Sequence, residues 1–141
     1  MTLHEEYRRI IIGDLNKAIE MAKTVEYPED KMYFFSISFA SIQRIINLQY
    51  NQTLVFVHQI LQSTHQSIMQ RLATRSHLVS QGTPESFIEL PFIYLNNLLQ
   101  AISENSENRI WSVLEEFSQL WYATSGNGFY LFLDGKMNLD K

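Results

Sequence analysis

Two histidines on one predicted helix are the first residues whose type and spacing could support chemistry. His58 and His65 stand seven residues apart within an apolar stripe, so two helical turns, about 10.5 Å, separate them along the axis. That separation is too long for both to bind one metal ion directly, and the sequence indicates no metal site and no cofactor. An imidazole beside a carboxylate in a dry interior can relay protons or line a polar pocket.

Asp14 is the carboxylate that could complete such a pocket, because it falls inside the apolar stripe of the first predicted helix. If Asp14 meets one of the histidines across the bundle, the three residues form the candidate polar pocket: Asp14, His58 and His65. The alternative is that both histidines are core-edge residues bonded to serine, asparagine or a carboxylate.

A group of cations forms a second candidate site. Arg71, Arg75 and His77 follow one another near a predicted helix end, and no acid occurs between Asp30 and Glu85. The helix dipole favours cations at a C-terminus, so an anionic partner such as a nucleic acid could bind there. Alternatively, these cations merely suit the helix end and pair with acids of this chain or of another copy.

Arg71 and His77 also have a spacing compatible with that of the arginine and histidine in small helical-bundle ribonucleases of the HEPN group. The match covers seven residues, and Leu72 stands where those enzymes usually carry a polar residue. We therefore claim no resemblance to that family. A bundle ribonuclease or nucleic-acid-binding protein using Arg71, Arg75 and His77 remains the alternative function.

Aromatic residues near the end of the chain indicate an interface. Trp111 and Tyr122 lie on a second face of the last predicted helix, about 100° from its apolar stripe. Tryptophan and tyrosine are typical anchors of protein interfaces, and monomers rarely expose groups of them. Together with the tail aromatics, they form the candidate dimer interface: Trp111, Tyr122, Phe129, Tyr130 and Phe132.

The elements that must position these residues are predicted to be helices, because apolar residues recur at three- and four-residue steps. The predicted helices cover about 3–26, 30–48, 53–79, 84–103 and 107–124, and a tail at 129–139 carries a hairpin signal, Asp134-Gly135. Short connections make consecutive helices antiparallel. We therefore expect an all-α, up-and-down bundle of four to five helices in one domain, 1–141, with a short C-terminal β-hairpin or extended tail.

The helix at 30–48 is apolar around most of its circumference, so we expect it to be the buried centre of the bundle. Ser36, Ala40, Gln43 and Asn47 are its narrow polar strip. The helix at 53–79 has an outer face of glutamine, serine and threonine without charge, which also favours self-association. We expect Pro91 to kink or split the helix at 84–103, and Ser106 to cap the next one.

Composition restricts the function further. The chain has 141 residues, of which 45% are hydrophobic and 18% charged, with a net charge of −4, as in an ordinary globular domain. The absence of cysteine excludes disulfides and thiolate chemistry. No segment is apolar enough to span a membrane and no signal peptide is evident, so we expect a cytoplasmic protein.

Signatures of catalysis are missing, including phosphate-binding glycine loops and His-Glu-x-x-His. The sequence therefore favours a homodimeric interaction or scaffold protein over an enzyme, without excluding an enzyme. It leaves open whether a further protein partner binds. A pI near 5.5 argues against a general nucleic-acid-binding charge. A third hypothesis is a small-ligand sensor whose pocket holds Asp14, His58 and His65.

Overall fold

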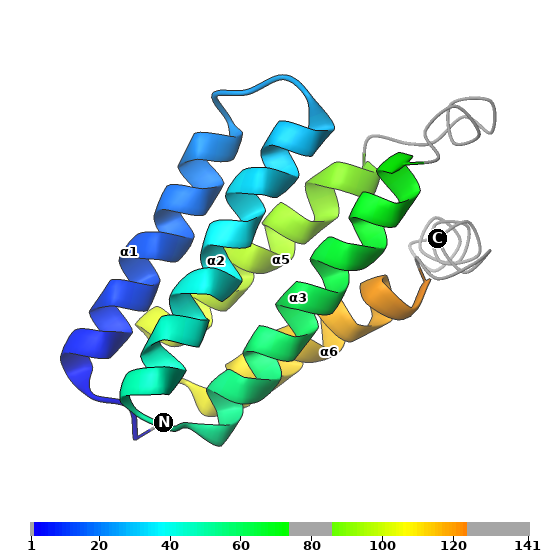
Figure 1. Ribbon diagram of the computed structural model, residues 1–141. Helices are drawn as coiled ribbons and strands as arrows, with labels where there is room; N and C mark the ends of the chain where they lie inside the picture. The colour runs from blue at the N-terminus through cyan, green and yellow to red at the C-terminus, as the bar shows by residue number, and fades with distance from the viewer. Residues whose placement is uncertain (1, 74–85, 124–141) are drawn as a thin grey trace.

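Five α-helices account for most of the chain in the computed structural model, which describes residues 2–73 and 86–123. They are α1 (Glu5–Ala22), α2 (Pro28–Leu48), α3 (Gln52–Ala73), α5 (Ser86–Ser103) and α6 (Glu107–Ala123) (Figure 1). Within these ranges there is no strand, so the prediction of an all-α bundle is confirmed. The predicted hairpin at 129–139 lies outside the described residues.

The helix boundaries follow from capping chemistry. α2 begins at Pro28, two residues before the predicted start, because proline already has a helical φ and the first turn needs no N–H donor from it. α1 ends at Ala22, earlier than predicted. Its last carbonyl groups need partners, and Lys31 Nζ donates to the Ala22 carbonyl oxygen over 2.9 Å.

The turn between α5 and α6 is very short. Asn105 has φ 54°, the left-handed conformation that ends many helices, and the Ser106 N–H donates back to the Ala101 carbonyl oxygen over 3.0 Å. Ser106 Oγ then accepts a hydrogen bond of 3.3 Å from the Arg109 N–H, so the predicted cap of α6 is confirmed. Pro91 is buried in α5 and does not split the helix.

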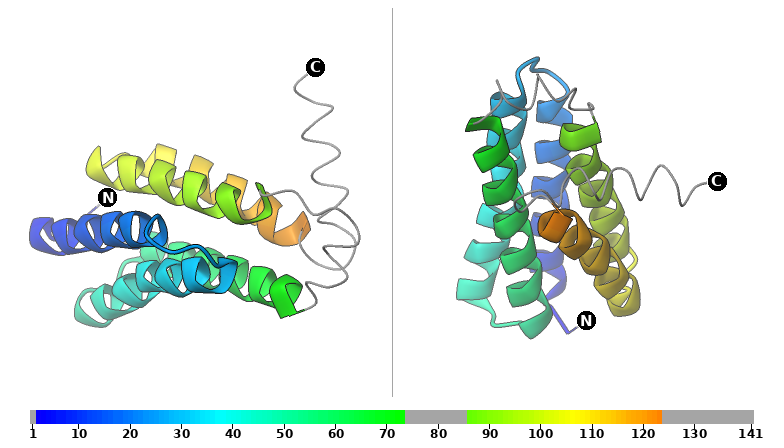
Figure 2. Two further views of the ribbon diagram at one scale, coloured as in Figure 1. Left: turned by 90° about the horizontal axis from the view of Figure 1, so that it is seen from above. Right: turned by 90° about the vertical axis from the view of Figure 1, so that its right-hand side faces the viewer.

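The helices form a closed ring. α2 packs on α1 and α3, α5 packs on α1 and α6, and α3 and α6 close the ring. Figure 2 shows α5 and α6 as a pair on one side, α2 and α3 as a pair on the other, and α1 between them. Consecutive helices alternate in direction, as predicted. In a closed ring of five helices, at least one pair of neighbours must run in the same direction. Here that pair is α3 and α6, which run parallel (Figure 1).

The expectation that α2 forms the centre of the bundle is wrong. α2 is one member of the ring, and Tyr33 and Leu48 on its outer side are 67% and 64% exposed. Its buried face instead includes two serines, Ser38 and Ser41. Ser38 Oγ donates to the Phe35 carbonyl oxygen over 2.6 Å, and such a bond removes most of the cost of burying a hydroxyl.

The core is centred on aromatic side chains from three helices. Phe35 of α2 is fully buried, and its ring centroid lies 5.6 Å from that of Phe92 on α5 and 6.4 Å from that of Phe117 on α6. Tyr94 of α5 also meets Phe117 edge-on at 5.5 Å. The centre of the bundle is therefore a shared contact of three helices.

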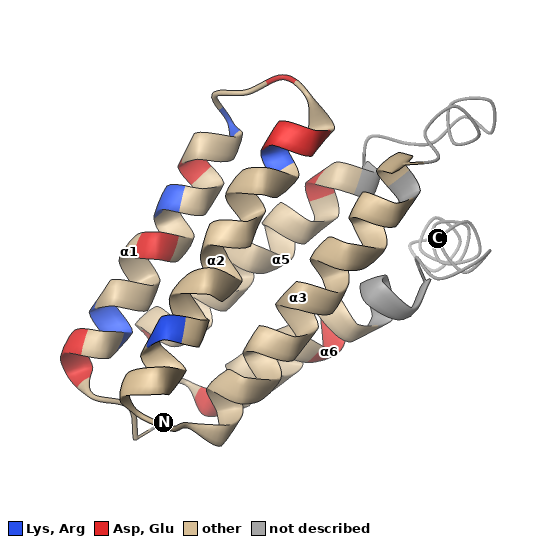
Figure 3. Cartoon of the chain, in the orientation of Figure 1, with Lys and Arg blue, Asp and Glu red and all other residues tan. Residues whose placement is uncertain are grey.

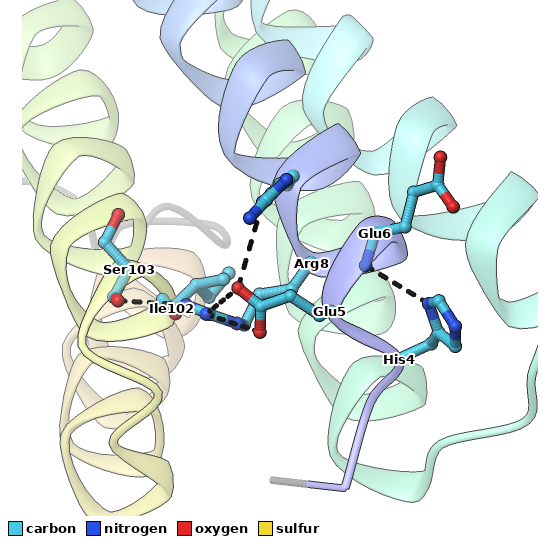
Figure 4. A network of polar contacts seen from close by, with 7 residues as sticks. His4, Glu5, Glu6, Arg8, Ile102 and Ser103 are labelled. Atoms are coloured by element: carbon cyan, nitrogen blue, oxygen red, sulfur yellow. Dashed lines mark hydrogen bonds and ion pairs between the residues drawn. The ribbon is translucent and has the colours of Figure 1, made fainter.

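Arg8 fastens the beginning of α1 to the end of α5 (Figure 4). One guanidinium nitrogen donates to the carbonyl oxygens of Ile102 and Ser103 over 3.1 and 2.9 Å. The other nitrogen pairs with both carboxylate oxygens of Glu5 at 2.6 and 2.8 Å. A cation at the C-terminus of α5 also suits the helix dipole.

Across the described residues, we find no helix with the length and apolar character that a membrane span needs.

Candidate functional site

The predicted polar pocket is divided between two helix contacts. Asp14 of α1 faces α2, where its Oδ2 accepts hydrogen bonds from Ser41 Oγ at 2.6 Å and from an Arg44 guanidinium nitrogen at 3.2 Å. The carboxylate is mostly buried, at 26% exposed, whereas Arg44 is 68% exposed. Asp14 is therefore engaged with a hydroxyl and a base of α2, while the two histidines belong to α3.

His58 and His65 lie in the seam between α2 and α3, on either side of Phe39. The centroid of the Phe39 ring is 6.0 Å from that of His58 and 5.3 Å from that of His65, and both contacts are edge-on. His65 also lies nearly parallel to the buried Phe35 ring, at 6.4 Å. The histidines thus meet aromatic rings, which is the environment of core-edge residues.

The seam favours the neutral imidazole. Burial lowers the pKa of His58 below its ordinary value. Burial also lowers the pKa of His65, although the hydrogen bond that its imidazole donates to the Met32 carbonyl oxygen acts in the opposite direction. Because desolvation dominates for both, the pair is held neutral in the folded protein at physiological pH.

The outer side of α2 and α3 is poor in charged residues. Between Met32 and Gln70 the only acidic or strongly basic residue is Arg44, which is bonded to Asp14 on the α1 side. Figure 3 shows α3 without a charged residue from Gln52 to Gln70. We call the following residues the α2–α3 face: Ser36, Ala40, Gln43 and Asn47 of α2, and Gln59, Gln62, Gln66 and Gln70 of α3.

Trp111 is exposed, as the sequence predicted, but it has a partner that the sequence analysis missed. Trp111 is 42% exposed and Phe56 of α3 is 39% exposed, and their ring centroids are 5.4 Å apart. Phe56 falls outside the apolar stripe of α3, which includes Leu54 and Val57. Its place outside the stripe was the sign in the sequence that Phe56 is an aromatic residue on the surface.

The other candidate residues belong to the parts of the chain that the structure does not describe. Arg75, His77, Phe129, Tyr130 and Phe132 lie outside the described residues, as do the side chains of Arg71 and Tyr122. The ribonuclease or nucleic-acid patch, and the part of the dimer interface that depends on the tail, therefore stay predictions. In the two described ranges, no three histidine, aspartate or glutamate side chains gather as metal ligands would.

Comparison with protein-family models, with curated proteins and with solved structures finds no match for this chain. A functional hypothesis must therefore come from the surfaces themselves.

Proposed function

We propose that this chain is a homodimeric interaction or scaffold protein without a catalytic role, and that two copies associate through the α2–α3 face. The observation that carries the proposal is the absence of charge from this face. A helix surface that only meets water normally carries lysine and glutamate. Here the exposed polar positions of α3 whose side chains the structure describes are glutamines instead: Gln52, Gln59, Gln62, Gln66 and Gln70.

Amide side chains suit a two-fold interface because each has donors and an acceptor. In a symmetric dimer the same patch meets itself, so a charged patch would bring like charges together, whereas glutamines can bond to glutamines. Gln43 already donates to Asn47 Oδ1 over 3.2 Å on this face. The half-buried Phe39 ring in the seam supplies apolar area at the centre of the same surface.

Trp111, which the sequence favoured as a dimer anchor, suits self-association less well. Glu107 and Glu115 stand one turn before and one turn after it on α6, on the same side of the helix. A two-fold contact there would place four carboxylates around two indoles. We therefore propose the α2–α3 face as the dimer contact.

Sedimentation at micromolar concentration tests the proposal. The wild-type protein should sediment as a dimer, twice the 16.6 kDa of one chain. A variant with both Gln62→Glu and Gln66→Glu should be monomeric, because the new charges would face one another across the two-fold axis. The matched control carries Asn96→Glu and Gln100→Glu, which place two acids on the exposed side of α5.

The control should remain a dimer. A wild-type protein that sediments only as a single chain, or a dimer that survives the α3 substitutions and not the α5 substitutions, would contradict the proposed function.

A further inference from the structure

The aromatic pair of Phe56 and Trp111 is a surface that the proposed dimer does not use. We call it the Phe56–Trp111 patch. It bridges α3 and α6, and each of its two side chains is about two-fifths exposed, at 39% and 42%. Large aromatic side chains that remain exposed together commonly mark a contact site for another molecule.

Polar contacts hold the patch in one arrangement. Thr53 Oγ1 donates to Glu107 Oε1 over 2.7 Å, which ties the beginning of α3 to the beginning of α6. That hydrogen bond lowers the pKa of Glu107, and a hydrogen bond with the Trp111 side chain has the same effect. The indole is therefore oriented by a carboxylate that stays ionised, and a partner would not have to order it.

On α6, the charged side chains closest to Trp111 are acidic, or basic and already paired. Glu107 and Glu115 flank Trp111 along α6, and the nearest base on that helix, Arg109, is paired with Glu104. α3 contributes glutamines and no lysine or arginine between Gln52 and Gln70. An aromatic ring with carboxylates on both sides is the environment that attracts a guanidinium group, which stacks on the ring and bonds to carboxylates.

We propose that the Phe56–Trp111 patch docks a basic peptide segment of another protein, one that carries arginine next to an apolar residue. The guanidinium stacks on Trp111 and pairs with Glu115, and the apolar side chain covers Phe56. This inference goes beyond self-association and uses a different surface, so the two proposals can fail separately.

Titration calorimetry with synthetic peptides tests it. The probe is a blocked hexapeptide of alternating arginine and leucine, and its control has citrulline, the neutral isostere, in place of arginine. The arginine peptide should bind the wild-type protein, and Trp111→Ala should weaken binding roughly tenfold or more, as expected for an interface anchor. Glu115→Gln should weaken it several-fold, more strongly at low salt.

The control variant is Tyr50→Ala, which removes an aromatic side chain that is 73% exposed elsewhere on the surface and should leave peptide affinity unchanged. Equal binding of the citrulline peptide, or equal affinity for Trp111→Ala and Tyr50→Ala, would overturn the proposal. So would a wild-type dimer that Trp111→Ala dissociates, because the patch would then be occupied by a second copy.

Discussion

A single arginine fastens the beginning of α1 to the end of α5. Arg8 is only 15% exposed, and its guanidinium donates to two of the last carbonyl groups of α5, which lack the N–H partners of a continuing helix. The Ile102 carbonyl oxygen also accepts from the Asn105 N–H over 3.0 Å. We expect Arg8→Met to lower the free energy of unfolding by about 1–3 kcal/mol, since hydrogen bonds to charged groups contribute about that much. Urea denaturation measures the change.

Arg9 provides the matched control for Arg8. It is 77% exposed and lies 3.9 Å from Glu5, and a surface ion pair of this kind contributes about 0–1 kcal/mol. Arg9→Met should therefore change stability far less than Arg8→Met. If the two variants lose the same stability, the capping role of Arg8 is wrong.

The histidines of the seam make stability depend on pH. Burial lowers the pKa of both His58 and His65 in the folded state, so the unfolded chain takes up protons first as the pH falls. The contribution of the two neutral histidines to the free energy of unfolding is therefore fully present above the ordinary histidine pKa of about 6.5. It declines as the pH drops below that value. Urea midpoints at pH 7.5 and pH 5.0 should show this decline.

The double variant His58→Gln, His65→Gln isolates the effect of the seam. Its urea midpoint should fall less between the two pH values than that of the wild type, because carboxylates elsewhere are retained in both proteins. An identical decrease in both would mean that the histidines do not contribute.

At the scale of the helices, Phe35 is the central residue of α2. Phe35 is fully buried and Tyr33, two residues earlier, is 67% exposed. Phe35→Ala should lower the free energy of unfolding by about 3–5 kcal/mol, because its neighbours on α5 and α6 cannot fill the cavity. Tyr33→Ala should change it by no more than about 0.5 kcal/mol. Thermal denaturation that ranks the two variants the other way would refute this assignment of the core.

The α5–α6 turn depends on one backbone conformation. Asn105 has φ 54°, which asparagine and glycine tolerate and residues with an ordinary Cβ adopt at a cost of about 1–2 kcal/mol. Asn105→Ala should therefore lower the free energy of unfolding by about 1 kcal/mol, whereas Asn105→Gly should leave it equal or higher. Chemical denaturation of the two variants measures the difference, and a less stable glycine variant would contradict the argument.

Hydrophobic periodicity predicted where helices occur better than which way they face. Ile10 is one of the apolar residues that recur at helical spacing in α1, yet it is 42% exposed while Leu15 and Ile19 are buried. Ile10 and Ile11 are adjacent, so periodicity alone cannot decide which of them is central. Which side of α1 is buried depends on α2 and α5, on which α1 packs. The local sequence does not contain that information.

Long-range pairing explains the errors in the candidate site as well. The sequence suggested that Asp14 meets a histidine across the bundle, because Asp14, His58 and His65 all lie in apolar stripes. The hydroxyl that donates to Asp14 belongs to Ser41, which is fully buried at 0% exposure although it is a polar residue. The pairing of Phe56 with Trp111 depends on the parallel contact of α3 and α6, which short connections do not predict.

At the scale of the whole molecule, the ring leaves two kinds of surface. The outer side of α2 and α3 carries one charged residue between Met32 and Gln70, Arg44, which is bonded to Asp14. Most of the other charged residues visible in Figure 3 lie on α1, near the ends of α2 and on the other helices. An uncharged face can meet itself, and an acidic aromatic patch suits a cationic partner. The distribution of charge around the ring therefore favours different sides for the two proposed contacts, self-association and the binding of a partner.

The position of the histidines makes the proposed dimer sensitive to acid. His58 and His65 lie in the seam beneath the α2–α3 face, and the only other ionisable residues between Met32 and Gln70 are Tyr33, Arg44 and Tyr50. A second copy would bury the imidazoles further, so association favours their neutral form, and protonation would place positive charges near the two-fold axis. The dimer should therefore be weaker at pH 5.0 than at pH 7.5.

Sedimentation at the two pH values measures this dependence, and the double variant His58→Gln, His65→Gln supplies the comparison. Glutamine keeps a neutral amide in the seam at both pH values, so the variant should dimerise equally well at both, whereas the wild-type dimer should be weaker at pH 5.0. A folded wild-type dimer of equal strength at both pH values would place the histidines away from the interface. The α2–α3 face would then not be the surface through which two copies meet.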